Sequence, residues 1–307
     1  MKHTIRIGTR ESQLAVWQAT AVQQLLAAHN YASELVFIKS EGDIDLQTPL
    51  YAIGVQGIFT RSLDIALLHN KIDIAVHSMK DVPVQLPAGI VQAAVLERAS
   101  YKDLLVYKGD PSFLNNFEGE AVIATSSIRR QAQWLHRFPR HRIENLRGNV
   151  NTRLQKLQDN PWNGAIFAAA GLERIQLRPA NAIELDWMLP APAQGAIMVV
   201  CREADTTCLS ACQPFNHAAT ALCVKIERDF LQTLLGGCST PISALANIEN
   251  NNLHFKGNIV LPDGTEIIDT HCTVPLQDAA NTGVTAAHTI LEKGGRQLTA
   301  RVQHVTK

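Results

Sequence analysis

Seven arginines gather between residues 129 and 153, a stretch with no lysine and a single acid, Glu144. The whole chain is balanced, with 28 basic and 28 acidic residues and a formal net charge of zero. A guanidinium grips a carboxylate or phosphate through two parallel hydrogen bonds, whereas an ammonium acts as a point charge. This local excess indicates a site that holds several anionic groups, and a solvated basic face is the alternative. The arginines are Arg129, Arg130, Arg137, Arg140, Arg142, Arg147 and Arg153.

Two arginine motifs follow predicted strands and begin predicted helices. Residues 125–130 read Thr-Ser-Ser-Ile-Arg-Arg, and residues 147–153 read Arg-Gly-Asn-Val-Asn-Thr-Arg. Hydroxyls and open backbone N–H groups at a helix start bind anions. A weaker motif of the same kind, residues 9–12, reads Thr-Arg-Glu-Ser. Each alone fits an ordinary capped helix, but three such starts after strands favour anion binding.

A polar run ends another buried strand. The apolar strand at residues 72–76 continues into Ser78, Lys80 and Asp81 before a proline. Ligands of open α/β sheets bind beyond the carboxyl ends of the strands, so we place these three side chains in a candidate site. Asp81 as a turn residue bonded to its own backbone is the alternative. His77 is interpreted as a satisfied core histidine.

The six cysteines do not make a disulfide framework in so long a chain. Cys238 follows two glycines, which present it on a turn after a predicted helix. No histidine adjoins it, so the sequence does not indicate a local thiolate–imidazole pair, and a structural loop cysteine is the alternative. Cys201, Cys208 and Cys212 match no standard zinc spacing with His217, and we predict no metal.

The elements that must position these groups alternate between strand and helix over the first two-thirds of the chain. Residues 165–169 and 196–201 are continuously apolar and are interpreted as buried parallel strands. The predicted strands are 4–8, 35–39, 72–76, 91–96, 104–107, 121–125, 143–146, 165–169 and 196–201. The predicted helices are 12–29, 59–68, 128–138 and 150–157.

The fold class is therefore α/β, with a change of pattern near the C-terminus. Connectors at residues 99–102 and 189–195 suit two α/β lobes joined by a double crossover, with a ligand cleft between them. From about residue 218 the pattern becomes a small α+β unit, with a helix at 219–235, a hairpin at 253–274 and a helix at 279–293. We expect domain 1 at 1–98 and 195–217, domain 2 at 99–194 and domain 3 at 218–307.

Composition narrows the class of protein. With 307 residues, 46% of them apolar and 18% charged, the chain fits a soluble globular protein with real cores. It shows no apolar run of transmembrane length and no apolar leader, so we expect a cytoplasmic protein that does not bind membranes. Zero net charge, and an arginine stretch without lysine, argue against nucleic-acid binding.

In their order and spacing these motifs resemble the porphobilinogen deaminase family, over almost the whole chain. The resemblance is carried by Gly8-Thr9-Arg10-Glu11-Ser12-Gln13-Leu14-Ala15, His77-Ser78-Met79-Lys80-Asp81-Val82-Pro83, Thr125-Ser126-Ser127-Ile128-Arg129-Arg130, Leu146-Arg147-Gly148-Asn149-Val150, Ala170-Gly171-Leu172, Gln194-Gly195-Ala196 and Gly236-Gly237-Cys238. It implies two lobes like those of periplasmic-type binding proteins, with the active site in their cleft, and a third domain. It also implies a dipyrromethane cofactor bonded to Cys238 by a thioether.

Members of this family add four porphobilinogen units one after another, release ammonia each time and free the linear tetrapyrrole hydroxymethylbilane, a step of haem biosynthesis. We expect a monomer. The alternative is a non-catalytic bilobal receptor for a small carboxylate, which gives no reason for Cys238 or for a third domain. Nucleic-acid binding through the arginine stretch is a weaker alternative.

The resemblance also implies roles for individual residues. Asp81 would stabilise the cationic ring that loss of ammonia leaves. The cofactor would be bound by Cys238, Lys80, Ser78, Thr125, Ser126, Ser127, Arg129, Arg130, Arg147, Gly148 and Arg153. The substrate would be bound by Arg10, Ser12, Gln18, Phe59, Arg174 and Gln194.

The chain departs from the family pattern at three positions. Ala52 and Gln56 stand where many relatives have lysines in a glycine-rich loop, and Ala193 stands where glycine is frequent. We therefore expect weaker substrate binding or altered loop closure than in lysine-bearing relatives, and a stiffer hinge.

Overall fold

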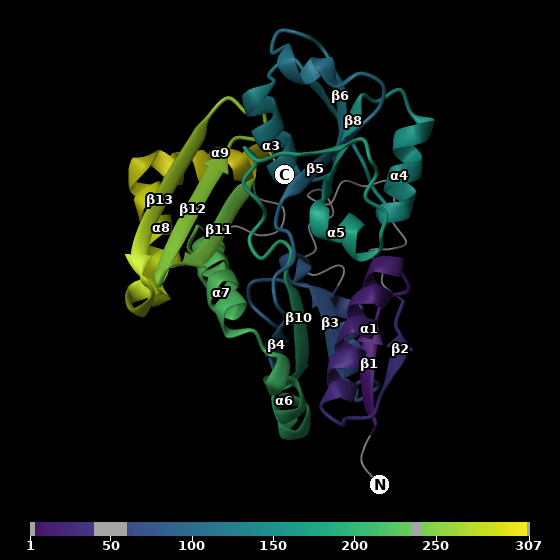
Figure 1. Ribbon diagram of the computed structural model, residues 1–307. Helices are drawn as coiled ribbons and strands as arrows, with labels where there is room; N and C mark the ends of the chain where they lie inside the picture. Colours follow the sequence, from purple (N-terminus) through teal and green to yellow (C-terminus); the bar gives the residue numbers. More distant parts are fainter. Residues whose placement is uncertain (1–3, 40–59, 235–240, 306–307) are drawn as a thin grey trace. The chain divides into compact units, whose positions relative to one another are not determined.

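The computed structural model describes residues 4–39, 60–234 and 241–305, and its contacts divide the chain into two compact units (Figure 1). The first unit contains residues 4–39, 60–99 and 195–222, and the second contains the other described residues. The described chain therefore passes between the units after Ala99, after Gln194 and after Leu222. The division into three domains stays a prediction. No described helix is long and apolar enough to cross a bilayer.

The first unit is built on a five-stranded sheet with the order β2-β1-β3-β10-β4. Its strands are β1 (Ile5–Thr9), β2 (Ser33–Phe37), β3 (Ile74–Ser78), β4 (Ile90–Val95) and β10 (Ile197–Arg202). β1 pairs in parallel with β2 and β3, whereas β10 is antiparallel to both of its neighbours. The prediction of a parallel strand at residues 196–201 is therefore wrong, because an apolar run records burial on both faces and not direction.

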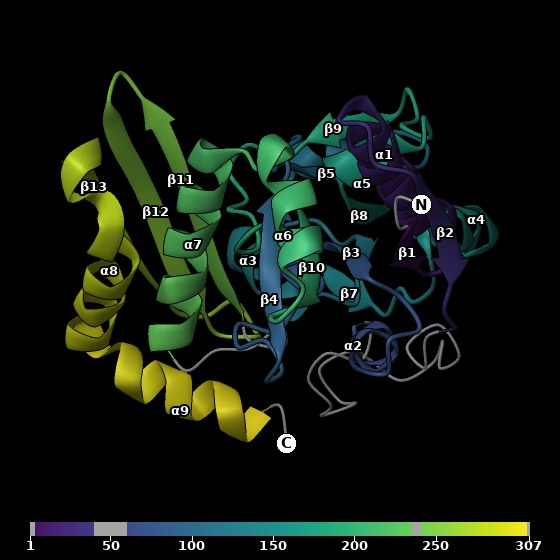
Figure 2. The same ribbon diagram turned by 90° about the horizontal axis from the view of Figure 1, so that it is seen from below.

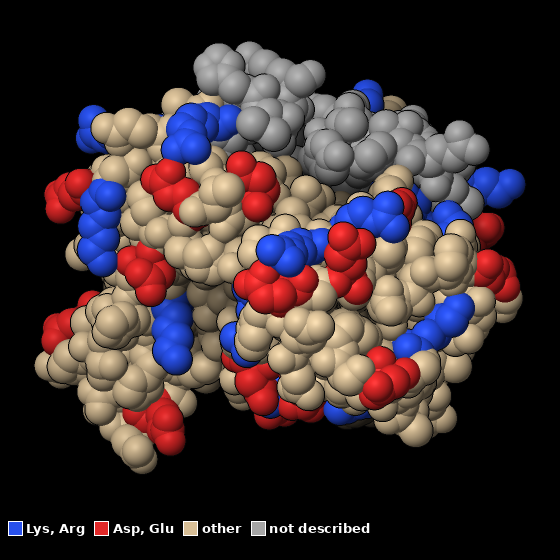
Figure 3. Space-filling model, turned by 90° about the horizontal axis from the view of Figure 1, so that it is seen from above, with Lys and Arg blue, Asp and Glu red and all other residues tan. Residues whose placement is uncertain are grey.

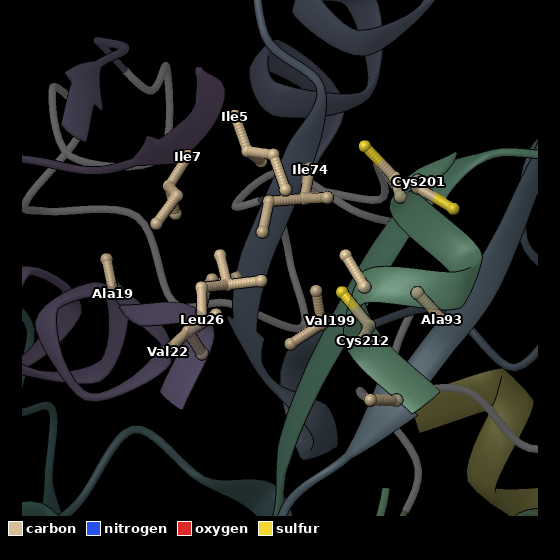
Figure 4. Packing of buried hydrophobic residues seen from close by; sticks show 14 of the residues in the cluster. Ile5, Ile7, Ala19, Val22, Leu26, Ile74, Ala93, Val199, Cys201 and Cys212 are labelled. Atoms are coloured by element: carbon tan, nitrogen blue, oxygen red, sulfur yellow. The ribbon is translucent and has the colours of Figure 1, made fainter. Parts of the chain in front are cut away.

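Helices cover both faces of this sheet (Figure 2). Side chains of α1 (Gln13–Ala28) and α6 (Thr206–Cys212) share one core with Ile5, Ile7 and Cys201, which Figure 4 shows. Strand alternation turns Gly8 to the other face, where a Cβ atom would come within 3.0 Å of Leu63 on α2 (Arg61–Leu68). Side chains thus pack on both faces of β1, with Ile5 and Ile7 against α1 and Gly8 against α2.

The second unit contains a five-stranded sheet with the order β7-β6-β8-β5-β9. Its strands are β5 (Asp103–Tyr107), β6 (Val122–Ala124), β7 (Arg142–Glu144), β8 (Gly164–Ala168) and β9 (Ala182–Glu184). β6 is parallel to β7 and β8, and β5 is antiparallel to β8 and β9. The parallel pairing predicted for residues 165–169 is thus correct only on the β6 side. β9 was not predicted, since it has three residues and none is fully buried.

The faces of this second sheet carry separate cores. Leu104 packs with residues of α4 (Val150–Asp159) and α5 (Ala169–Arg174), whereas its neighbour Leu105 packs with Trp134 and Phe138 on the side of α3 (Ile128–Arg137). This alternation is the period of two that a strand imposes on consecutive side chains. The sheet is therefore buried on both faces, and its carboxyl edge is the place left for polar groups.

The C-terminal part of the second unit is an antiparallel sheet with the order β11-β12-β13. It consists of β11 (Ile242–Glu249), β12 (Asn252–Val260) and β13 (Ile267–Pro275), with α8 (Thr282–Ile290), α9 (Arg296–Val305) and the part of α7 (Ala218–Thr233) that follows Leu222. The predicted hairpin is confirmed as β12–β13. β11 was missed, because its two alanines and an asparagine give a weak strand signal. The last helix is broken at Gly294, where φ is 105°.

Candidate active site

Two predicted motifs meet at the carboxyl edge of the first sheet. β1 and β3 are parallel neighbours, so Arg10 after β1 and Asp81 after β3 leave the sheet at the same edge. Since β1 leads outward to β2 and β3 lies on its other side, this edge is a topological switch point, where open α/β sheets bind ligands. A small pocket there is lined by Arg10, Ala15, Gln18, Thr60, Val76, His77, Ser78 and Asp81.

Side chains from α1 and β3 are bonded to each other in this pocket. Nε2 of Gln18 donates a 2.9 Å hydrogen bond to Oγ of Ser78, and Gln18 is buried. Ser12 caps α1, accepting a 3.4 Å hydrogen bond from the N–H of Ala15. Lys80 lies in the 3-10 turn that follows β3. The structure thus brings Arg10, Gln18, Ser78 and Asp81 together in one pocket. Ser12 and Lys80 lie close in sequence to these residues but do not line the pocket.

His77 differs from the satisfied core histidine that we expected. Its ring is buried and lines the pocket, but Nε2 has no hydrogen-bond partner among the described residues. Burial, with a smaller contribution from the charge of Arg10, lowers the pKa of His77 to about 3. The imidazole is therefore neutral near pH 7. Alternation along a strand indicates which face of the sheet a residue occupies, but not whether a hydrogen-bond partner lies on that face.

Sequence reasoning missed the contribution of α2 to the pocket. Thr60, which precedes α2, lines it, and Asp64 lies one turn further along that helix. Burial raises the pKa of Asp64 to about 6, although a hydrogen bond with Thr60 opposes the shift. The available signal in the sequence was an acidic residue, Asp64, within an amphipathic helix.

The two strongest arginine motifs also come together, at the carboxyl edge of the second sheet. The N–H of Thr125 donates to the carbonyl of Glu144 at 2.8 Å, which continues the parallel pairing of β6 and β7. Oγ of Ser126 lies 2.7 Å from Oδ1 of Asn145 and accepts a 3.0 Å hydrogen bond from the N–H of Leu146. These bonds place the two motifs side by side at this edge.

The hydroxyls of these motifs shape the helix starts. Oγ1 of Thr125 accepts from the N–H of Ser127, and Ser127 caps α3 by accepting from the N–H of Arg130. Gly148 has a φ of 115°, and a Cβ atom there would lie 2.7 Å from Thr152 at the start of α4. The capping roles that we gave as alternatives are therefore present, and they fix the backbone that carries the arginines.

Arg129 and Arg130 are both buried and share one carboxylate. Asp103, which is fully buried, accepts from Nη2 of Arg129 at 2.6 Å and from Nη2 of Arg130 at 2.7 Å. Nη1 of Arg129 donates to the carbonyl of Leu189, and Nη1 of Arg130 donates to the carbonyl of Ile166. Burial lowers the pKa of Arg129, which the charge of Asp103 opposes and that of Arg130 reinforces. No sequence motif pointed to Asp103.

Three further arginines belong to elements that start at this edge. Arg147 follows β7 and is 2% exposed, Arg153 lies in the first turn of α4, and Arg174 ends α5, which follows β8. Burial lowers the pKa of Arg174 to about 10, a change that leaves it charged near pH 7. Each guanidinium is therefore carried by an element that leaves one of the three parallel strands.

The connector before β10 is held by side chains of its own unit. Nε2 of Gln194 donates to the carbonyl of Tyr101 at 2.8 Å and to Oδ1 of Asp103 at 3.0 Å. Ala193 is buried with a φ of 62°, and its N–H donates to the Glu227 carboxylate at 2.6 Å. Alanine is strained in this left-handed conformation. The expectation of a stiffer hinge stays a prediction.

Several residues named from the sequence lie outside the described residues. These are Phe59, Cys238, Ala52 and Gln56. Cys201, Cys208 and Cys212 are buried in the core of the first unit, where burial raises the pKa of Cys201 to about 11. Within the described ranges no group of three or more His, Cys, Asp and Glu side chains is arranged to hold a metal ion.

Two family models match the chain. Residues 5–210 match "Porphobilinogen deaminase, dipyromethane cofactor binding domain", and residues 221–292 match "Porphobilinogen deaminase, C-terminal domain". Porphobilinogen deaminase of Syntrophotalea carbinolica is 41% identical over 300 residues, which cover 96% of this chain and 95% of that protein. Chloroplastic porphobilinogen deaminase of Oryza sativa subsp. japonica is 40% identical over 302 residues, 95% of this chain and 84% of that protein.

Solved structures at low identity also share part of the chain path. The VFT2 domain of Bordetella pertussis BvgS, as a double mutant, has a TM-score of 0.41 at 12% identity, covering 71% of this chain and 90% of that chain. A probable amino-acid ABC transporter extracellular-binding protein of Bacillus subtilis, ytmK, has a TM-score of 0.44 at 10% identity, covering 70% of this chain and 91% of that chain.

Proposed function

The chain belongs to the porphobilinogen deaminase family, and on this premise we propose how its residues carry out the reaction. The enzyme is a transferase that condenses four porphobilinogen molecules head to tail, with loss of ammonia, into the linear tetrapyrrole hydroxymethylbilane. It builds this chain on a covalently bound dipyrromethane primer, in tetrapyrrole and haem biosynthesis. Identity of 40% or more over nearly the full chain carries the assignment, and we do not retain the receptor alternative.

We assign Asp81 the catalytic role. Its support is the shared pocket with Arg10, which pairs a carboxylate with a guanidinium at a sheet edge that binds ligands. Arg10 would hold a carboxylate of the substrate. When the C–N bond of the protonated aminomethyl group breaks, its electron pair leaves with ammonia and the positive charge passes to the ring. The Asp81 carboxylate, facing the pyrrole N–H groups, would stabilise that charge.

Other residues would bind and orient the substrate in this scheme. Gln18 is supported by its place in the pocket and its hydrogen bond to Ser78. Ser12, Phe59, Arg174 and Gln194 are proposed from their match to the family motifs. Gln194 binds protein groups in the structure, which favours an indirect contribution.

The residues at the edge of the second sheet fit a dipyrromethane group. Each of its pyrroles carries an acetate and a propionate, so the ligand needs several cationic hydrogen-bond donors. Nε of Arg129 is buried without a hydrogen-bond partner among the described residues, as expected of a donor that awaits an acceptor. We propose that Arg129, Arg130, Arg147 and Arg153 hold its carboxylates, with Lys80, Ser78, Thr125, Ser126, Ser127 and Gly148 assisting. When bound, the cofactor supplies the ring to which the first substrate joins.

Intact-mass measurement tests the proposal. The purified chain should be heavier than its sequence by two condensed pyrrole units, and Cys238→Ser should abolish that increment. Cys272→Ser is the matched control, since Cys272 is a free cysteine of β13 and is not fully buried. An unmodified wild-type mass, together with no ammonia released from porphobilinogen, would show that the proposed function is wrong.

We also propose that the enzyme is a cytoplasmic monomer that binds neither nucleic acid nor membranes. The support is the formal net charge of zero, and on the face that Figure 3 shows, acidic and basic side chains are interspersed. Sedimentation equilibrium and cell fractionation test these points. A stable dimer, or a membrane-associated fraction, would contradict them.

A further inference from the structure

Asp103 has no part in the roles assigned above, although it is the most connected acid at the edge of the second sheet. It is the first residue of β5, and its side chain is 0% exposed. Oδ1 accepts from Nε and Nη2 of Arg130 at 3.1 and 2.7 Å and from Nε2 of Gln194 at 3.0 Å. Oδ2 accepts from Nη2 of Arg129 at 2.6 Å. One buried carboxylate therefore receives donors from three side chains.

These bonds fix the planes of two guanidinium groups. All three nitrogens of Arg130 are bonded to the protein, because Nη1 donates to the carbonyl of Ile166 at 2.9 Å. Arg129 is held between Asp103 and the carbonyl of Leu189, 2.7 Å from Nη1, and its Nε has no partner in the part of the chain that the structure describes. A planar guanidinium held at two nitrogens cannot turn, so the direction of its third N–H is set.

The charges in this cluster do not cancel. Two guanidiniums and one carboxylate leave one positive charge in a site that is almost completely buried. An uncompensated buried charge is costly, and an incoming carboxylate relieves that cost. Without Asp103 the two guanidiniums would face each other with two positive charges and no common acceptor.

We propose that Asp103 is a positioning residue, whose carboxylate fixes Arg129 in the orientation that binds a carboxylate of the pyrrole ligand. Arg130 and Gln194 hold the Asp103 carboxylate in place through their hydrogen bonds to Oδ1. The inference rests on the proposed function, in which Arg129 holds the cofactor. A role of Asp103 in orientation and a role in charge have opposite consequences. Loss of its negative charge makes the cluster more positive, which strengthens the attraction of anions. Loss of alignment of Arg129 makes the cluster bind anions less well.

Asp103→Asn separates these roles, because it removes the charge and keeps the shape. Asp73→Asn is the matched control. Asp73 is also a buried carboxylate that two arginines share, accepting from Nη2 of Arg6 at 2.8 Å and from Nη2 of Arg202 at 3.1 Å, and it does not line the pocket of the first unit. This variant thus removes a shared buried carboxylate without touching Asp103, Arg129 or Leu189. Both variants are made in cells that lack porphobilinogen, and porphobilinogen is then added.

Two readouts are compared with thermal stability. The first is the rate at which intact mass rises by two pyrrole units, and the second is the split between KM and kcat. We expect both variants to lose stability, but only Asp103→Asn to slow the mass increase and raise KM, each about tenfold, as expected when one charge-assisted hydrogen bond is misaligned. Asp103→Glu, which keeps the charge, should recover part of the mass-increase rate.

Several outcomes overturn the inference. A lower KM in Asp103→Asn would mean that the carboxylate acts by charge alone, and changes no larger than those of Asp73→Asn would mean a structural role alone. Failure of both Asp103 variants to fold would also count against it, since a residue required for folding is not specific to ligand binding. A wild-type chain that never gains mass overturns the proposed function, whatever the variants do.

Discussion

Nε2 of Gln18 donates a 2.9 Å hydrogen bond to Oγ of Ser78 across 60 residues of sequence. The bond joins α1 to the carboxyl end of β3, in the wall of the pocket that also contains Arg10 and Asp81. A single side-chain contact thus aligns the two motifs that the sequence singles out in the first unit. It is the direct structural link between the helix that follows β1 and the turn that carries the proposed catalytic acid.

Replacing Gln18 by leucine should raise KM for porphobilinogen several-fold. The change removes one neutral hydrogen bond and leaves Ser78 without that partner, which costs about 1 kcal/mol or roughly fivefold in affinity. Gln23→Leu is the control, because Gln23 lies on the same helix and bonds only the Ser33 carbonyl, outside the pocket. Equal KM values for the two variants in steady-state assays would contradict the prediction.

Asp73 should make the first unit sensitive to acid. Burial opposes its ionisation, but hydrogen bonds from Arg6 and Arg202 outweigh burial and lower its pKa to about 2. Because the folded pKa lies below the ordinary value of 3.8, its contribution is complete above about pH 4 and is lost as the pH falls through about 2. Asp73→Asn should therefore cost about 2 kcal/mol at pH 7, by urea unfolding, and progressively less below pH 4.

Glu118→Gln serves as the control for Asp73. Glu118 pairs with Arg140 at 2.9 Å, but the side chains are 78% and 62% exposed, so the pair should contribute little. A loss at pH 7 as large as that of Asp73→Asn would show that burial is not the deciding difference.

His77 should destabilise the fold at mildly acidic pH. Its pKa is about 3 in the folded chain against an ordinary 6.5, so between these values the unfolded chain binds a proton that the native chain does not. Stability must then rise with pH across this window, by about 1.4 kcal/mol per unit. His77→Gln removes this dependence. The unfolding free energies of wild type and variant should diverge in slope below about pH 6.5, and parallel curves would contradict the prediction.

Gly264 should resist substitution more strongly than Gly109. Both have positive φ, 76° and 66°, so alanine is strained at either position. A Cβ atom on Gly264 would lie 2.3 Å from the backbone nitrogen of His136, whereas nothing lies within 4 Å of one on Gly109. We expect Gly109→Ala to cost about 1 kcal/mol and Gly264→Ala at least about 2 kcal/mol more. Comparable urea midpoints would show that α3 can move away.

Local features of the site were predictable from the sequence. Strands followed by Arg10, Ser78 and Arg129 were recognised from apolar runs that end in polar residues, and parallel pairing then placed the ends of β1 and β3 at one edge. The helix starts were equally readable, since Ser12 and Ser127 cap α1 and α3 as their residue types suggest.

What the amino-acid order alone determined is short-range: which segments alternate, where strands stop, which residues begin helices and which motifs the family shares. The tertiary structure decided the direction of β10, the unsatisfied ring of His77 in the pocket wall, and the joining of Arg129, Arg130 and Gln194 by Asp103. Those three donors stand 26, 27 and 91 residues from Asp103. No local pattern encodes such a partnership, because it exists only once separate strands bring their ends to one edge.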